Sequence, residues 1–212
     1  MIPLGDLVPS RTRPVATLTL GAVSIAGSVA LWASLGSASV PPARLGLSPA
    51  AWTWAGAVWS LTAYRGITAC VACLLALWLF GPTVEDRLGP RRFVLLWLAS
   101  GLSAVAGHIA VAPHATTLLL GGVGATAGVI AGNLALHPRG RVLAVTPVVV
   151  GFEFVDLPSW LYAGVWLSVI PLATLAPLPV ILVTCATGAA AGATAALLLK
   201  HPERMRIEWW GR

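Results

Sequence analysis

Three cysteines are the most chemically reactive side chains in this sequence. Cys70 and Cys73 form a Cys-x-x-Cys pair, and Cys185 lies far along the chain. A thiolate binds a metal or attacks a substrate only when a positive neighbour stabilises it, and the sequence places no basic residue beside these three. We expect them to be small apolar fillers. The sequence therefore predicts no metal and no other cofactor, and a redox or metal role for the cysteines is the less favoured alternative.

The histidines and one threonine add little to this chemistry. His108, His114 and His137 are too scattered along the predicted elements to complete a Cys/His metal site. Thr126 lies in a run of small residues, but a weakly acidic hydroxyl becomes a nucleophile only beside a base. We therefore expect Thr126 to hydrogen-bond a carbonyl of its own preceding turn, as threonines in apolar helices do.

Long uncharged stretches must position these residues. Apolar residues make up 58% of the chain and charged residues only 9%, which is typical of a protein in a bilayer. At about 20 residues per span, the stretches predict six transmembrane helices in a single domain, residues 1–212. The first helix is expected to be retained, because no small-residue cleavage site follows a short apolar core. The expected positions are 15–35, 65–82, 93–112, 120–137, 158–175 and 178–199.

The segment between the first two predicted helices is rich in aromatic residues. Leu45–Tyr64 carries Trp52, Trp54, Trp59 and Tyr64, and such side chains prefer the interface between membrane and water. We interpret this segment as a partly embedded interfacial loop.

Positive charge is distributed unevenly between the two sides of the predicted bundle. Only Arg44 and Arg65, of thirteen basic residues, lie on one side. By the positive-inside rule, both termini are expected to be cytoplasmic, as in a bacterial inner (cell) membrane protein. The net charge of +6 needs only the lipid bilayer as its partner, and no nucleic acid. The other eleven are Arg11, Arg13, Arg87, Arg91, Arg92, Arg139, Arg141, Lys200, Arg204, Arg206 and Arg212.

Glycines recur every four residues in two of the predicted helices. Gly124, Gly128 and Gly132 form one stripe, and Gly188 and Gly192 form a second. In lipid, such stripes let two backbones approach closely and gain many dispersion contacts. The sequence therefore predicts that the fourth and sixth helices cross at these glycines.

Four stretches carry distinctive motifs: Met1–Val15, Leu77–Phe93 with its pattern Gly81-x3-Glu85-x3-Gly89, Gly121–Val142, and the pair Gly188 and Gly192. Their order and spacing resemble the rhomboid family of intramembrane serine proteases. The resemblance covers nearly the whole chain. It implies an all-α membrane protein, a six-transmembrane-helix rhomboid-like bundle with an interfacial loop between helices 1 and 2.

Glu85 belongs to the cytoplasmic turn of that pattern, between Gly81 and Gly89. It is followed by several arginines, among which a carboxylate can be paired or hydrated. We expect a structural role for Glu85 and not that of a catalytic acid.

The resemblance also implies a serine and histidine dyad, with a histidine and an asparagine that stabilise the oxyanion. Aligned by the motifs, the serine position falls on Val123 and the histidine position on Cys185. The oxyanion positions fall on Ala69 and Cys73. All four polar residues of the family mechanism are thus replaced, while the motifs around them remain. The resemblance is therefore to a catalytically inactive member, a pseudoprotease.

Three classes of function follow from this reading. The favoured one is a non-proteolytic protein, comparable in principle to the derlins and inactive rhomboids, that binds transmembrane segments of client proteins or serves as a subunit of a membrane complex. The alternative is an active rhomboid-type protease with an unrecognised nucleophile, such as Thr126 or Cys185. A channel or transporter has the least support, because the helices contain almost no ionisable residues.

Overall fold

The structure is a computed structural model of the 212-residue chain. It describes residues 2–6, 13–36, 48–51, 53–115, 118–119, 121–138, 141–148, 151–174 and 177–200. Predictions that concern other positions, among them Trp52 and six of the basic residues, lie outside the described residues. Those six are Arg11, Arg44, Arg139, Arg204, Arg206 and Arg212.

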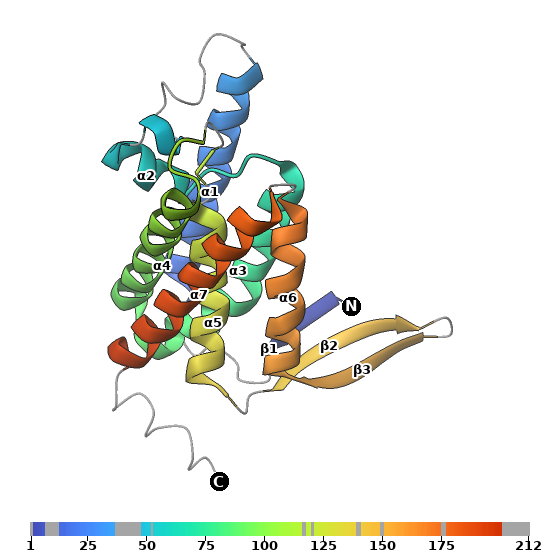
Figure 1. Ribbon diagram of the computed structural model, residues 1–212. Coiled ribbons are helices and arrows are strands. Elements are labelled where there is room, and N and C mark those ends of the chain that lie inside the picture. Colours follow the sequence, from blue (N-terminus) through green and yellow to red (C-terminus); the bar gives the residue numbers. More distant parts are fainter. Residues whose placement is uncertain are drawn as a thin grey trace.

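The described residues form a bundle of α-helices with short helical segments at one end (Figure 1). The predicted all-α membrane-bundle class is confirmed, and six of the helices overlap the six predicted stretches. The elements are α1 (Val15–Gly36), η2 (Pro49–Ala51), α2 (Trp54–Ser60), α3 (Ile67–Leu88), α4 (Pro90–Val111), α5 (Gly121–Leu136), α6 (Ser159–Ala173) and α7 (Leu178–Leu199).

Helix length separates these six into two groups. Among the described residues, four helices are long and apolar enough to cross a membrane: Val15–Ser34, Ile67–Leu88, Pro90–Val111 and Leu178–Leu199. The other two, α5 and α6, are shorter apolar helices of 16 and 15 residues. The count of six spans therefore stays a prediction. A short α5 is nevertheless compatible with a membrane bundle, because it lies among α3, α4 and α7 and is mostly buried.

The tight turn between α3 and α4 accounts for the spacing of the Gly81, Glu85 and Gly89 pattern. Gly89 has a φ of 82°, which favours glycine, and its N–H bonds the carbonyl of Glu85 at 2.7 Å. Pro90 then starts α4 at the position where a missing N–H costs nothing. At Gly81, an added Cβ would lie 2.7 Å from the side chain of Thr17, so this glycine lets α1 approach α3 closely.

A three-stranded antiparallel sheet in the order β1-β2-β3 extends sideways from one end of the bundle (Figure 1). Its strands are β1 (Ile2–Asp6), β2 (Arg141–Val148) and β3 (Gly151–Pro158). The sequence does not predict this sheet, because the two short stretches beyond α5 are also compatible with a connection between helices. They are rich in valine and phenylalanine, which favour strands, and β3 leads directly into α6.

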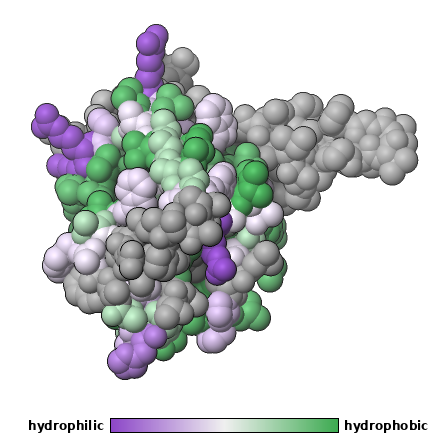
Figure 2. Space-filling view, turned by 90° about the horizontal axis from the view of Figure 1, so that it is seen from above, coloured by the Kyte–Doolittle hydropathy of each residue, from purple (hydrophilic) through white to green (hydrophobic). Residues whose placement is uncertain are grey.

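The two ends of the bundle differ in charge. Arg87, Arg91 and Arg92 lie at the turn between α3 and α4, and Lys200 follows α7 at the same end. Arg65 lies at the opposite end, where its carbonyl meets α1. The large apolar side chains exposed on the bundle lie along α1, α3, α4, α6 and α7, and the end of the bundle seen from above shows apolar side chains with several hydrophilic ones among them (Figure 2). This distribution fits contact with a lipid bilayer.

Candidate functional site

Helices α5 and α7 touch backbone to backbone at four glycines. A Cβ added to Gly188 would lie 2.7 Å from the carbonyl carbon of Gly124. One added to Gly192 would overlap the backbone of Gly128, including its carbonyl oxygen. No larger residue fits at either contact without separating the helices, which is how small residues act at helix crossings in lipid.

Helix α4 packs just as tightly against the same two glycines of α5. A Cβ on Gly124 would collide with the Cβ of Ala104, and one on Gly128 would collide with the side chain of Ser100. Ser100 itself bonds back to the carbonyl of Leu96 at 2.8 Å. Helix α5 is thus held between two neighbours, and this contact fixes the height and rotation of every residue it carries.

The two residues that the sequence assigns to the dyad positions lie within this tightly packed region. Val123 is 1% exposed and Cys185 is buried, and each lies within one turn of a glycine at the α5–α7 crossing. Cys73, on α3, is fully buried and belongs to the same apolar core as both. Ala69 is buried one turn earlier on α3. The structure thus gathers Val123, Cys185 and Cys73 in one core and adds Ala69 beside it.

Tyr64 occupies the space next to the start of α5. Its hydroxyl lies 3.4 Å from the carbonyl oxygen of Gly122 and 3.4 Å from the hydroxyl of Thr126. Helix α1 fixes the backbone of this residue: Tyr64 N–H donates to Ser28 Oγ at 3.1 Å, and Trp32 Nε1 donates to the Tyr64 carbonyl at 2.9 Å. Burial raises the pKa of Tyr64, so the phenol is neutral and offers no base.

The interpretation of Tyr64 as an interfacial aromatic was therefore wrong. Tyr64 is 2% exposed, whereas Trp54 and Trp59 on α2 are largely open to the surroundings. The reason is the pair of hydrogen bonds from α1, a helix more than thirty residues earlier in the chain. No local pattern signals such a contact, so Tyr64 is the residue of this site that the sequence reading missed.

Thr126 has only neutral partners among its described contacts. Its hydroxyl donates to the carbonyl of Gly122 at 2.9 Å, the bond expected of a threonine within a helix. Tyr64 and the thiol of Cys73 are its other neighbours. A carbonyl, a phenol and a thiol do not take a proton from an alcohol at neutral pH, so this arrangement does not activate Thr126.

The three cysteines are free thiols buried in the same region. Cys70 Sγ lies 3.7 Å from Ser28 Oγ, and Cys73 lies near both Cys70 and Cys185. In the part of the chain that the structure describes, no three side chains of the histidine, cysteine, aspartate or glutamate types come together to hold a metal ion. The contacts described for these thiols are with hydroxyl groups and with one another.

Glu85 binds the start of α1. Its carboxylate accepts hydrogen bonds from Ala16 N at 2.9 Å, from Thr17 N at 2.7 Å and from Thr17 Oγ1 at 2.8 Å. Two otherwise unsatisfied amides at a helix N-terminus are thereby paired, and the charge is favourable beside the positive end of the helix dipole. The described partners of Glu85 thus lie on α1. The sequence had instead suggested the arginines that follow it.

Two arginines tie the same end of the bundle together. Arg87 Nε donates to His137 Nε2 at 2.8 Å, and the other ring nitrogen of His137 lies 3.2 Å from Asn133 Oδ1. Because an arginine only donates, this geometry requires a neutral His137 whose Nδ1 carries the proton. Arg92 donates to the carbonyl of Leu199 at 3.0 Å and so caps α7. These contacts join α3 to α5 and α4 to α7.

Comparison with known families places this arrangement in context. The family described as "Rhomboid domain" matches residues 60–202. Searches of curated proteins and of solved structures gave no match. The matched region contains both glycine stripes, the α3–α4 turn and the four residues that the sequence assigns to the catalytic positions, and it spans well over half of the chain. The chain belongs to the rhomboid family.

Proposed function

We propose that this protein is a non-proteolytic rhomboid-like membrane protein, which binds transmembrane segments of a client or serves as an accessory subunit of a membrane complex. One observation carries the proposal. By the family resemblance the serine and histidine positions fall on Val123 and Cys185; both residues are buried, and the neutral phenol of Tyr64 lies beside the start of α5.

The chemistry of acyl transfer supports the loss of proteolysis. A serine nucleophile needs a base within hydrogen-bond reach and preorganised donors for the oxyanion. Val123 has no hydroxyl, and neither Ala69 nor Cys73 replaces a histidine or an asparagine as a donor. A hydrolytic site must also admit water, whereas the residues around Val123 are packed without exposed polar groups.

The apolar faces of α3 and α6 are the surface that suits a transmembrane partner. On α3, Ile67, Val71, Leu75 and Trp78 are exposed at three- and four-residue intervals, so they form one stripe. Helix α6 exposes a similar set, Trp160, Leu161, Val165, Val169 and Leu172. A partner helix in lipid would contact uncharged apolar side chains on both faces, and its affinity would depend on how closely its shape fits theirs.

The contact between α3 and α6 is made by side chains. Phe80 and Tyr162 place their ring centroids 5.9 Å apart, and Tyr162 and Trp166 follow at 6.4 Å. Near the other end, Thr68 Oγ1 donates to the carbonyl of Ala173 at 2.8 Å. Side chains change rotamer more readily than backbones move apart, so this seam can yield to a partner where the α5–α7 crossing cannot.

Site-specific photocrosslinking tests the proposal. A photoreactive residue at Leu75 or Val165 should form an adduct with a defined membrane protein, identified by mass spectrometry. The matched control is Val23 on α1, because all three side chains are about half exposed: 51%, 50% and 49%. Equal adducts at all three positions, or none at Leu75 and Val165, would rule out this binding surface.

The proposal includes an orientation, with both termini on the cytoplasmic side of a bacterial inner membrane. The described basic residues support it, because most lie at the end where α3 meets α4. Reporter fusions at Asp86 and Gly140 should then read cytoplasmic, and fusions at Ala51 and Ala115 should read external. One reversed reporter among the four would contradict this topology.

A further inference from the structure

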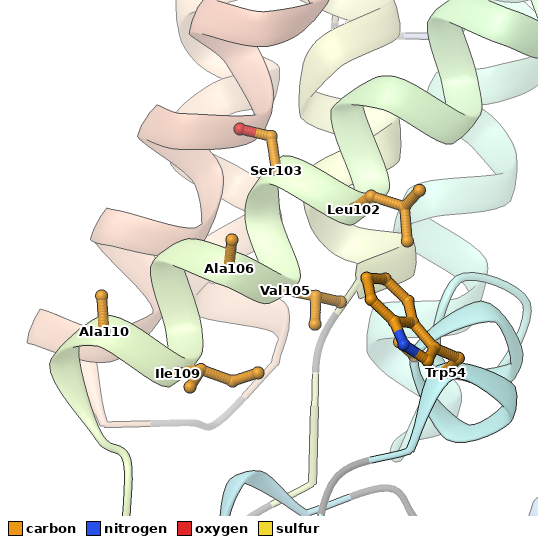
Figure 3. Close-up of a pocket in the computed structure, with 8 residues that line it drawn as sticks. Trp54, Leu102, Ser103, Val105, Ala106, Ile109 and Ala110 are labelled. Atoms are coloured by element: carbon orange, nitrogen blue, oxygen red, sulfur yellow. The ribbon is translucent and has the colours of Figure 1, made fainter.

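An apolar groove of about 650 Å³ lies between the short helix α2 and the second half of α4 (Figure 3). Helix α2 approaches α4 and α5 from the end of the bundle opposite the arginine-rich turn. The groove is lined by Trp54 and Ala57 from α2 and by Leu102, Ser103, Val105, Ala106, Ile109 and Ala110 from α4.

Small residues create this hollow. Ala57 and Val105 are almost fully buried and form its floor, while Ala106 and Ala110 are exposed along one side. The indole of Trp54 extends from α2 toward α4, beside Val105 (Figure 3). A linear ligand in this space would therefore contact protein on several sides, and it would gain more dispersion contacts than on a flat helix face.

The position of the groove along α4 indicates which medium it meets. Leu102 lies twelve residues and Ala110 twenty residues beyond Pro90, which is about 18 and 30 Å along the helix at 1.5 Å per residue. Pro90 marks the basic end of the bundle, so the groove lies in the far half of a hydrocarbon layer about 30 Å thick. It is continuous with other exposed apolar side chains of α4 such as Val111.

Water is a poor occupant of this groove. A bound water needs two to four polar partners, and the lining contains no charged residue. The hydroxyl of Ser103 is already used, because it donates to the carbonyl of Thr187 on α7 at 3.3 Å. A partner helix is about 10 Å across with its side chains, whereas a single extended hydrocarbon chain is narrow enough to lie along the small side chains of α4 beside Trp54.

We propose that the groove between α2 and α4 binds a single acyl chain of a membrane phospholipid. The acyl chain lies along Leu102–Ala110, over the small side chains of α4, and Trp54 closes the groove on the α2 side. The indole also suits the level of the headgroup, where tryptophan prefers to lie. This site is separate from the surface proposed for transmembrane partners, and either proposal can fail without the other.

Photolabelling in nanodiscs tests the site. The probe is a phosphatidylcholine with a diazirine in its acyl chain, diluted into unlabelled phosphatidylcholine, and the adducts are mapped by peptide mass spectrometry. The expected result is adducts concentrated on Leu102–Ala110 and Trp54 that saturate as the probe fraction rises. Labelling spread evenly over the exposed face of α4, including Ala99, would overturn the proposal.

Two variants of α4 sharpen this experiment. Ala106→Phe fills the groove, whereas Ala99→Phe places the same ring on an exposed position of the same helix outside it. Labelling of Leu102–Ala110 should fall severalfold in Ala106→Phe and remain unchanged in Ala99→Phe. Ala110→Phe provides a second filling variant if Ala106→Phe does not fold. Unchanged labelling in a folded filling variant, or a crosslink from the groove to a second protein chain, would contradict the proposal.

Discussion

The α5–α7 crossing and the α3–α6 seam lie in the same bundle but are built differently. At the crossing, Gly188 and Gly192 place one backbone directly on another. At the seam, aromatic rings and one threonine hydroxyl bridge the helices. The first contact leaves no room for any added atom, while the second consists of groups with rotamer freedom. The comparison teaches that α5 and α7, to which the sequence assigns the dyad positions, make the more closely packed of these two contacts.

The same difference is consistent with the proposed loss of catalysis. Buried polar groups in lipid must be paired or hydrated, so a chain with Val123 and Cys185 in place of a dyad would avoid that requirement and keep the crossing. The outer helices retain exposed apolar faces, and on those faces a binding function needs no catalytic residue.

Substitution at the crossing should have the largest effect. Gly192→Leu or Gly128→Leu should lower the stability of the folded protein by more than about 3 kcal/mol, because the side chain meets backbone that cannot move aside. Thermal unfolding in mild detergent measures this loss of stability. Gly164→Leu on α6 is the control, since a Cβ there has no neighbour within 4 Å. If the Gly192→Leu variant unfolds at the same temperature as the parent protein, helices α5 and α7 do not meet as described.

Loss of the Glu85 carboxylate should have the next largest effect. This carboxylate fixes α3 to α1, so that only the contact of α3 with α6 is free to adjust. Glu85→Ala removes the acceptor of two amides, those of Ala16 and Thr17, and each unsatisfied buried donor costs about 1–3 kcal/mol. Hydrogen exchange at the start of α1 should increase. Glu85→Gln, which keeps one acceptor, should fall between Glu85→Ala and the parent. Unchanged exchange in Glu85→Ala would show that α1 is held by other contacts.

A cavity at the dyad position should cost less. Val123→Ala removes two methyl groups from a buried site and should destabilise the protein by about 1–3 kcal/mol. Val23→Ala on the exposed face of α1 is the matched control and should change little. Equal melting temperatures for the two variants would mean that Val123 is not packed within the crossing.

The smallest effect is expected when Tyr64 loses only its hydroxyl. Its two hydroxyl contacts are long, 3.4 Å each, so Tyr64→Phe should cost less than about 1 kcal/mol, at the low end for a hydrogen bond. Tyr64→Ala, which empties the space beside α5, should cost several times more. The difference between the two variants in thermal unfolding measures how far the ring itself, and not its hydroxyl, closes the site.

The helical bundle was readable from the sequence because its signals are local. Uncharged stretches predict the positions of the helices, and the glycines of α5 and α7 lie every four residues on one face. Gly89 and Pro90 likewise mark the α3–α4 turn within a few residues.

The missed features depend on contacts between residues far apart in the sequence. Glu85 and its partners are separated by 68 and 69 residues, and Tyr64 is held by α1 through Ser28 and Trp32. The β2–β3 ribbon was missed for a different reason, since a short apolar stretch next to a predicted helix fits either element. The groove under Trp54 depends on the docking of α2, which no periodicity predicts.

The most direct test of the central claim is an activity measurement on the purified protein. Fluorophosphonate labelling and cleavage of a reporter transmembrane substrate should stay at background, with an active rhomboid protease as the positive control. The double variant Val123→Ser and Cys185→His should remain poor, because Ala69 and Cys73 still supply no oxyanion donor. Robust cleavage by the unaltered chain that is abolished by Thr126→Ala or by Cys185→Ala would contradict the account.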